Sequence, residues 1–391
     1  MHPIVIIGSG MAAYAVAREF RKLDSEAALM MICADDARNY AKPTLSNALV
    51  GNKAPAQIAL GDAEKMSAQL NLHILNHTWV KKIDAQQHLL SLEKDGQVTE
   101  QPYSKLILAL GATPIRVPLQ GNAADQLHVV NNLNDYTAFR AELDQKTAQR
   151  VVILGAGLIG CEFANDLQQS GHQATVIDLA EQPLARLLPS DVAQAFQQKL
   201  QDAGIGFELG TTVNAIDQQA DAYTVDLANG KVLEADVVLS AIGLRANTEL
   251  AEQAGIQVSR GIVTNTQLET SLADIYAVGD CAEVNGTLLP YVMPIMQQAR
   301  ALAKTLSGNS THVHYPAMPV AVKTPAAPLT VLPVPQQVNV TWQVEAQEDG
   351  LIAKALDDAD TLRGFVLLGA TAGKQRLSLT KLVPDLIPAQ A

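Results

Sequence analysis

The sequence predicts an α/β protein with two doubly wound, mostly parallel sheets and a C-terminal α+β domain. Two observations predict the sheets: an apolar run, closely spaced glycines and a helical pattern follow one another at residues 4–13 and again at 151–162. Alternating strands and helices are typical of such sheets. The third observation is a change in composition near residue 312. Beyond it, the chain is rich in prolines and then has several strand-like runs, and we expect a helix near residues 371–381.

The central unit, VVILGAGLIGCE, has glycines 155, 157 and 160 in the G-x-G-x-x-G spacing. Gly155 permits a tight turn, Gly157 lets a pyrophosphate approach the backbone, and Gly160 lets the helix pack on the strand. Asp178 lies 18 residues beyond Gly160, at the end of the apolar run TVID. An acid there binds a ribose 2′-hydroxyl. The following LAEQP has no basic residue for a 2′-phosphate, so the unit favours NAD over NADP.

The first unit repeats the pattern with Gly8, Gly10 and the small Ala13. A second acid follows an apolar strand, because Asp35 lies 22 residues beyond Ala13, and either Asp35 or its neighbour Asp36 is positioned to bind a ribose. Two such units in one chain predict two dinucleotide sites.

Composition and charge argue against several classes of function. A formal charge of −12 and a pI near 5.1 argue against nucleic-acid binding and against a role on anionic membranes. The three cysteines are far apart and the histidines have no metal-like spacing, so we expect no disulfide framework and no metal site. No run of about 18 uninterrupted apolar residues indicates a membrane span. We expect a cytoplasmic protein.

Three segments resemble a known family: YAKPTLSNAL at residues 40–49, the A-x-G-x-x-P run within residues 105–118, and TSLADIYAVGDCAEV at residues 270–284. The combination is similar to the glutathione-reductase-like flavoprotein reductases, in which the first site holds tightly bound, non-covalent FAD and the second binds NAD(P)H. Disulfide reductases of the family have redox cysteines where this chain has Lys-Pro-Thr-Leu-Ser. The difference indicates the branch that reduces rubredoxins and oxygenase ferredoxins.

The resemblance implies roles for individual residues. Lys42 would lie beside the flavin ring and pair with Glu162, and Asp280 would point at the ribitol and pyrophosphate. Lys42 and Lys323 would centre a basic patch for an acidic carrier, although each is equally well explained as a solvated lysine. The FAD contacts implied are Gly8, Gly10, Ala13, Asp35, Lys42, Pro43, Val80, Arg116, Gly279, Asp280, Tyr291 and Val292.

The order of segments predicts an FAD domain made of residues 1–116 and 245–311, an inserted NAD domain at 117–244, and an interface domain at 312–391. By resemblance, NADH would reduce the flavin, which would pass electrons singly to rubredoxin and on to an alkane hydroxylase. Flavorubredoxin or an oxygenase ferredoxin remain alternative acceptors, and an NADH oxidase or a flavin-binding sensor are alternative functions. Either a monomer or a homodimer is compatible with the sequence.

Overall fold

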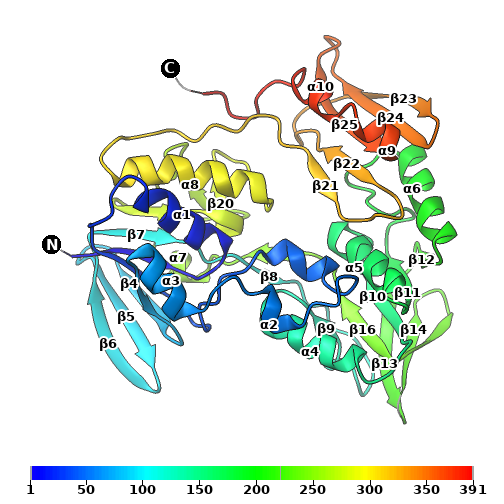
Figure 1. Cartoon of the computed structure of the whole chain (residues 1–391), viewed down its shortest axis with the longest axis horizontal. Coiled ribbons are helices and arrows are strands. Elements are labelled where there is room, and N and C mark those ends of the chain that lie inside the picture. Colours follow the sequence, from blue (N-terminus) through cyan, green and yellow to red (C-terminus); the bar gives the residue numbers. More distant parts are fainter. Residues whose placement is uncertain (1, 221, 390–391) are drawn as a thin grey trace.

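A computed structural model describes residues 2–220 and 222–389 (Figure 1). Its first parallel sheet has the strand order β19-β7-β1-β2-β3. The strands are β1 (Ile4–Ile7), β2 (Leu29–Ile32), β3 (His73–Leu75), β7 (Lys105–Leu108) and β19 (Ile275–Ala277). β1 is apolar and buried along its whole length, as expected of a central parallel strand. Because β19 comes from far beyond the second sheet in the sequence, the first domain is discontinuous, as predicted.

Helices and a small antiparallel sheet surround this first sheet. Helices α1 (Met11–Arg21) and α8 (Val292–Leu306) pack on each other and contribute to one apolar core with the sheet. The antiparallel sheet joins β4 (Trp79–Asp84), β5 (Leu89–Lys94) and β6 (Gln97–Pro102), at the left of Figure 1. The remaining elements are α2 (Pro55–Ile58), α3 (Ala63–Leu70), α7 (Glu249–Gln253), β18 (Ile262–Thr264), β20 (Ala282–Val284) and the 3₁₀ helices η1 (Lys42–Asn47) and η2 (Gly279–Cys281).

The second parallel sheet has the order β12-β11-β10-β16-β9. It comprises β9 (His128–Val129), β10 (Arg150–Leu154), β11 (Gln173–Asp178), β12 (Gly206–Leu209) and β16 (Val237–Ser240). Its helices are α4 (Leu133–Leu143), α5 (Leu158–Gln169) and α6 (Ser190–Asp202). An antiparallel sheet of β13 (Val213–Gln219), β14 (Ala222–Leu227) and β15 (Val232–Ala235) completes this unit.

Two short strands connect the parallel sheets. β8 (Ala112–Pro114) leads into the second unit and β17 (Leu244–Ala246) leads out of it, and the two pair with each other in an antiparallel ribbon. The chain therefore enters and leaves the inserted unit at one place.

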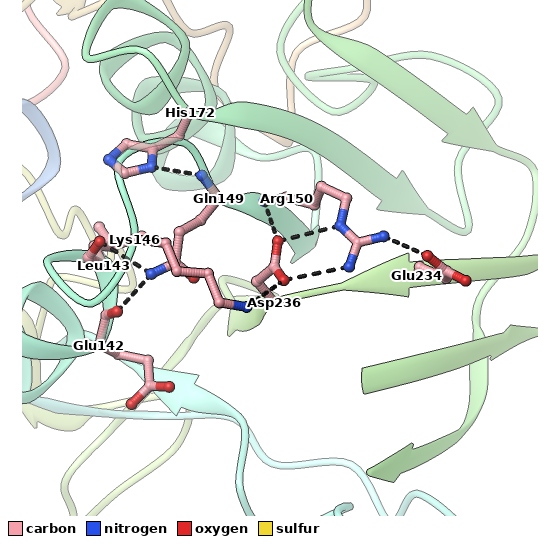
Figure 2. A network of polar contacts seen from close by, with 8 residues as sticks. All are labelled: Glu142, Leu143, Lys146, Gln149, Arg150, His172, Glu234 and Asp236. Carbon is pink, nitrogen blue, oxygen red and sulfur yellow. Dashed lines mark hydrogen bonds and ion pairs between the residues drawn. The ribbon is translucent and has the colours of Figure 1, made fainter. Parts of the chain in front are cut away.

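A polar network closes the end of β10 that lies opposite its glycine-rich turn (Figure 2). The Asp236 carboxylate accepts hydrogen bonds from the backbone N–H of Arg150 at 2.9 Å and from its Nε at 3.1 Å, and it pairs with Lys146 at 2.9 Å. Arg150 also pairs with Glu234. Next to this group, the Gln149 N–H donates to His172 Nδ1 at 3.2 Å. The network joins β10 to the link between β15 and β16, so we interpret it as structural.

The C-terminal sheet is antiparallel, with the order β21-β22-β25-β24-β23. Its strands are β21 (Val320–Val322), β22 (Leu329–Leu332), β23 (Thr341–Gln347), β24 (Gly350–Leu356) and β25 (Leu362–Leu368). One face shares an apolar core with α5 and α6, and the other is covered by the short helices α9 (Ala370–Gly373) and α10 (Arg376–Thr380). The single helix predicted near residues 371–381 is thus two short helices.

No helix in the described part of the chain is long and apolar enough to cross a membrane.

Candidate functional site

The first glycine-rich turn connects β1 to α1. Gly8 has φ +111°, and a Cβ atom there would lie 2.3 Å from the carbonyl oxygen of Ala109, so the turn requires glycine. Gly10 is the N-cap of α1, and no atom lies within 4 Å of the place its Cβ would take. A phosphate therefore has room to approach the free N–H groups of the helix. Ala13 is fully buried in the core beneath the turn.

Asp35 lies just beyond the carboxyl end of β2. Its Oδ1 accepts hydrogen bonds from Ser9 Oγ at 2.6 Å and from the Ala37 N–H at 3.0 Å. Because Ser9 belongs to the glycine-rich turn, these bonds hold the exposed carboxylate beside it. The neighbouring Asp36 instead pairs with Arg38 at 2.7 Å. Of the two acids that the sequence left open, Asp35 is the one attached to the turn.

The second glycine-rich turn connects β10 to α5 in the same way. Gly155 has φ +106°, and a Cβ there would lie 2.5 Å from the Ala241 carbonyl oxygen. Gly157 is the N-cap of α5 and faces open space. A Cβ on Gly160 would lie 1.9 Å from the Gly155 carbonyl oxygen, so the helix can approach the turn only with glycine there. These positions fit a second pyrophosphate.

Asp178 ends β11 and lies over this second turn. Its Oδ2 accepts the Ala156 N–H at 2.6 Å, and its Oδ1 accepts the Ala180 N–H at 2.8 Å. The next residue, Leu179, has 73% of its surface exposed. The geometry places a fixed carboxylate and an apolar surface where an adenosine ribose and its base would lie.

Lys42, the first residue of η1, and Asp280, in η2, lie close enough for their charges to interact. Burial lowers the pKa of Lys42, while the carboxylates of Asp280 and Asp135 raise it in part. Burial raises the pKa of Asp280, and Lys42 opposes this shift. The two groups therefore influence each other's charge in a weakly hydrated region, which suits the polar end of a bound cofactor.

Gly279 fixes the position of the neighbouring Asp280. It has φ +80°, and a Cβ on it would lie 2.7 Å from Ala12 Cβ in α1. Its N–H donates to Gln298 Oε1 at 2.6 Å, and Gln298 Nε2 donates to the Tyr315 hydroxyl at 2.7 Å. These contacts hold the residue before Asp280 against α1 and α8, and connect it to the segment that leads into the C-terminal domain.

The predicted pair of Lys42 and Glu162 is wrong. The buried Glu162 carboxylate forms an ion pair with Lys323 Nζ, accepts the Lys323 N–H at 3.0 Å and accepts Ser46 Oγ at 2.7 Å. The physical reason is that Lys323 follows β21 and reaches α5 from the C-terminal domain. Since its side chain is 29% exposed and ion-paired, Lys323 is also not the free surface cation that the basic-patch hypothesis required.

The same face of α5 makes further contacts that the sequence did not indicate. Asn165 Oδ1 accepts the Ala326 N–H at 3.1 Å, and Asp166 accepts the N–H groups of Leu49 at 2.9 Å and Val50 at 3.1 Å. Burial raises the pKa of Asp166, and these two hydrogen bonds oppose the shift. This helix therefore joins all three parts of the chain. The only sequence signal was the spacing of Glu162, Asn165 and Asp166, which places three polar residues on one face of an otherwise apolar part of the helix.

The other residues predicted to contact FAD lie on several different elements of the chain. Val80 is a half-buried residue of β4, opposite Leu92. Arg116 is exposed and lines a cleft of about 410 Å³ near β9 and α4. Tyr291 is the N-cap of α8, and burial raises the pKa of its hydroxyl. Val292, 39% exposed, is the first residue of this helix. Pro43 occupies the first turn of η1.

Comparisons with known proteins agree with this geometry. Residues 2–304 match the pyridine nucleotide-disulphide oxidoreductase family, and residues 312–383 match the rubredoxin binding C-terminal domain. A rubredoxin-NAD(+) reductase of Acinetobacter baylyi is 70% identical over the full length of both chains. One of Alcanivorax borkumensis is 43% identical over 99% of this chain and 100% of its own. Putidaredoxin reductase, in a covalent complex with putidaredoxin, has a TM-score of 0.85 at 25% identity, covering 98% of this chain and 94% of its own.

Proposed function

We propose that this protein transfers electrons from NADH through FAD to rubredoxin, because the chain belongs to the pyridine nucleotide-disulphide oxidoreductase family. The match of residues 312–383 to a rubredoxin-binding domain is the observation that selects the acceptor. The two glycine-rich turns, each with a carboxylate fixed beside it, supply the sites for the two dinucleotides.

FAD would be held at the first site and would supply the chemistry for accepting a hydride and releasing single electrons. The N-terminus of α1 at Gly10 would bind the pyrophosphate, and Asp35 would bind the adenosine ribose. Asp280, held by Gly279, would accept hydrogen bonds from the ribitol. Lys42 would provide the positive charge beside the ring, in a region where burial strengthens its effect. Ala13, Pro43, Val80, Arg116, Tyr291 and Val292 complete the proposed FAD contacts.

NADH would bind at the second site, with its pyrophosphate at the N-terminus of α5 and its ribose on Asp178. The protein's part is to bind and orient. Burial raises the pKa of the three thiols, that of Cys281 to about 11, which disfavours thiolate chemistry. All three cysteines are free and buried.

We propose the domain bounds expected from the sequence: residues 1–116 with 245–311 for FAD, 117–244 for NAD, and 312–391 as the C-terminal interface domain. The pairing of β8 with β17 supports the two inner boundaries. We also propose a cytoplasmic protein whose rubredoxin serves an alkane hydroxylase. Deleting the gene would then abolish growth on alkanes as the sole carbon source, and normal growth would contradict this role.

The proposed activity is tested by mixing the flavoprotein anaerobically with NADH and then with oxidised rubredoxin in a stopped-flow instrument. We expect rapid loss of flavin absorbance, followed by loss of the rubredoxin absorbance. An oxygenase ferredoxin and a flavorubredoxin are the control acceptors. Faster reduction of either control would contradict rubredoxin as the physiological acceptor, and failure of NADH to bleach the flavin would contradict the whole proposal.

A further inference from the structure

The end of the chain returns to the first domain after it has completed the C-terminal sheet. Residues 384–389, which we call the tail, follow α10 and run beside the segment that joins α8 to β21 (Figure 1). Ile387 is 6% exposed and packs, with the partly buried Leu386, into the apolar core of the first parallel sheet. The tail is therefore anchored on the domain that contains the first glycine-rich turn.

The tail holds Tyr315 through its backbone. The N–H groups of Leu386 and Ile387 both donate to the Tyr315 carbonyl oxygen, at 2.8 and 3.1 Å, and the Tyr315 N–H donates to the Ile387 carbonyl oxygen at 2.9 Å. One residue earlier, His314 Nε2 pairs with Asp385 at 2.8 Å. Because the Tyr315 ring is 1% exposed in the same apolar core, a backbone fixed in this way also fixes where the hydroxyl lies.

The Tyr315 hydroxyl contacts Gln298, a buried residue in the middle of α8. Gln298 Nε2 donates to it at 2.7 Å, and Gln298 Oε1 accepts the Gly279 N–H at 2.6 Å. Only the carbonyl oxygen of the amide can accept an N–H, so the NH2 group must face Tyr315 and the hydroxyl must accept from it. Since Gln298 is 2% exposed, neither end of its amide can turn to water instead.

Gly279 is the residue through which these hydrogen bonds reach the cofactor site. Within the described residues, Gln298 is the acceptor of its N–H. Gly279 has φ +80°, and Asp280 follows it directly in η2. Glycine has no side chain to restrict its backbone, so the bond to Gln298 supplies a restriction that side-chain packing would otherwise provide. A rotation at Gly279 would move the Asp280 carboxyl group.

We propose that Gln298 and Tyr315 are positioning residues for Asp280, and that the tail holds them in place, so that the end of the chain sets how firmly FAD is retained. This role rests on the proposed function, in which Asp280 accepts hydrogen bonds from the ribitol. A carboxylate that is already oriented binds its ligand more tightly, because less rotational freedom is lost on binding. Both residues act through Gly279.

The test measures how fast FAD leaves the diluted holoenzyme, from the recovery of free-flavin fluorescence. Gln298→Met removes both hydrogen bonds at similar volume, and Tyr315→Phe removes only the hydroxyl. We expect the release rate to rise by about tenfold in Gln298→Met and by at least about threefold in Tyr315→Phe, as for the loss of buried hydrogen bonds. The visible circular dichroism of the flavin, recorded with excess FAD, should change in both variants, because it reports the surroundings of the bound flavin.

Tyr103→Phe is the matched control. Tyr103 is also 1% exposed in the core of the first sheet, and its hydroxyl makes no hydrogen bond to the described part of the chain. The control should leave both the release rate and the circular dichroism unchanged. Wild-type values of both in Gln298→Met and Tyr315→Phe would overturn the positioning role. An equal effect of Tyr103→Phe would overturn it too, because it would indicate a general loosening of the core.

A chain that ends at Pro384 tests the tail itself. We expect it to release FAD at least about threefold faster than wild type, yet to add less than about twofold in the Tyr315→Phe background, since both changes act through the same hydroxyl. Ile387→Ala, which weakens the packing of the tail without removing it, should act in the same direction and serves if the shortened chain does not fold. Additive effects would overturn the role of the tail.

These measurements are independent of the acceptor. If the yellow wild-type protein does not reduce rubredoxin, the proposed function fails, and FAD release still decides the roles of Gln298 and Tyr315. If the wild-type protein retains no FAD, both proposals fail together.

Discussion

Replacing Asp178 by alanine tests the second nucleotide site directly. Each carboxylate oxygen already accepts one backbone N–H, and a carboxylate has about four acceptor positions, so about two remain for ribose hydroxyls. Hydrogen bonds to a charged group contribute roughly 1.5–3 kcal/mol each. We therefore expect Asp178→Ala to weaken transition-state binding of NADH by about 3 kcal/mol or more, which lowers kcat/KM by about two orders of magnitude.

The same substitution should improve the use of NADPH, because the carboxylate repels a 2′-phosphate with an energy on the order of a few kcal/mol at contact distance. The assay is anaerobic flavin reduction at varied NADH and NADPH, compared as the ratio of the two kcat/KM values. Asp178→Asn preserves the shape of the side chain, and Asp191→Ala removes an exposed acid at the start of α6 as a control. A ratio for Asp178→Ala within about threefold of wild type would refute the assigned role, since the change expected is far larger.

Two further predictions concern stability and cofactor retention. Asp236→Asn should lower the free energy of unfolding by about 1.5 kcal/mol at neutral pH, because it removes a charge that accepts hydrogen bonds from the partly exposed Arg150. The Arg150 hydrogen bonds lower the pKa of Asp236, so this stabilisation is complete above the unfolded pKa of about 4 and is lost as pH falls through the folded value. Gly279→Ala should reduce the FAD content of the purified protein, since its Cβ would meet Ala12 at φ +80°. Gly286→Ala, at φ +75° but with open space around its Cβ, is the matched control for backbone strain.

Urea unfolding followed at several pH values measures the first effect. The difference between wild type and Asp236→Asn should narrow in acid, and a constant difference would contradict the ion-pair explanation. Flavin absorbance relative to protein measures the second effect. Equal loss of FAD in both glycine variants would show that strain alone, and not contact with α1, is responsible.

Local patterns predicted much of the fold and both glycine-rich turns. Gly8 and Gly155 adopt the positive φ angles that their motifs require, and the carboxylates of Asp35 and Asp178 lie beside those turns. Each glycine-rich turn lies between a strand and a helix that are consecutive in the sequence, and its carboxylate lies at or just beyond the end of the neighbouring parallel strand. The number of residues between the glycines and the carboxylate is therefore enough to predict that they lie side by side.

Contacts between distant segments were not predictable in this way. The sequence resemblance paired Glu162 with Lys42, on η1, and nothing in the local sequence indicates its actual partner Lys323, 161 residues away. The choice depends on how the C-terminal sheet packs against α5, where Asn165 and Ala326 also meet. The helix predicted near residues 371–381 is two short helices, and Ala372 of the first and Leu379 of the second both pack into the apolar core on that face of the C-terminal sheet.

Because β8 and β17 form one ribbon, the NAD-binding unit can be exchanged as a whole between related proteins. Its two ends meet where Pro114 lies opposite Leu244, so recombination at this ribbon would replace the unit without opening the first sheet. Such an exchange would change the preference for one nicotinamide cofactor while preserving the FAD-binding sheet. The exchanged unit must meet one requirement. It must contain a carboxylate equivalent to Glu162, which pairs with Lys323 and accepts a hydrogen bond from Ser46. Coenzyme preference and acceptor preference can thus diverge separately, provided that this one helix face is retained.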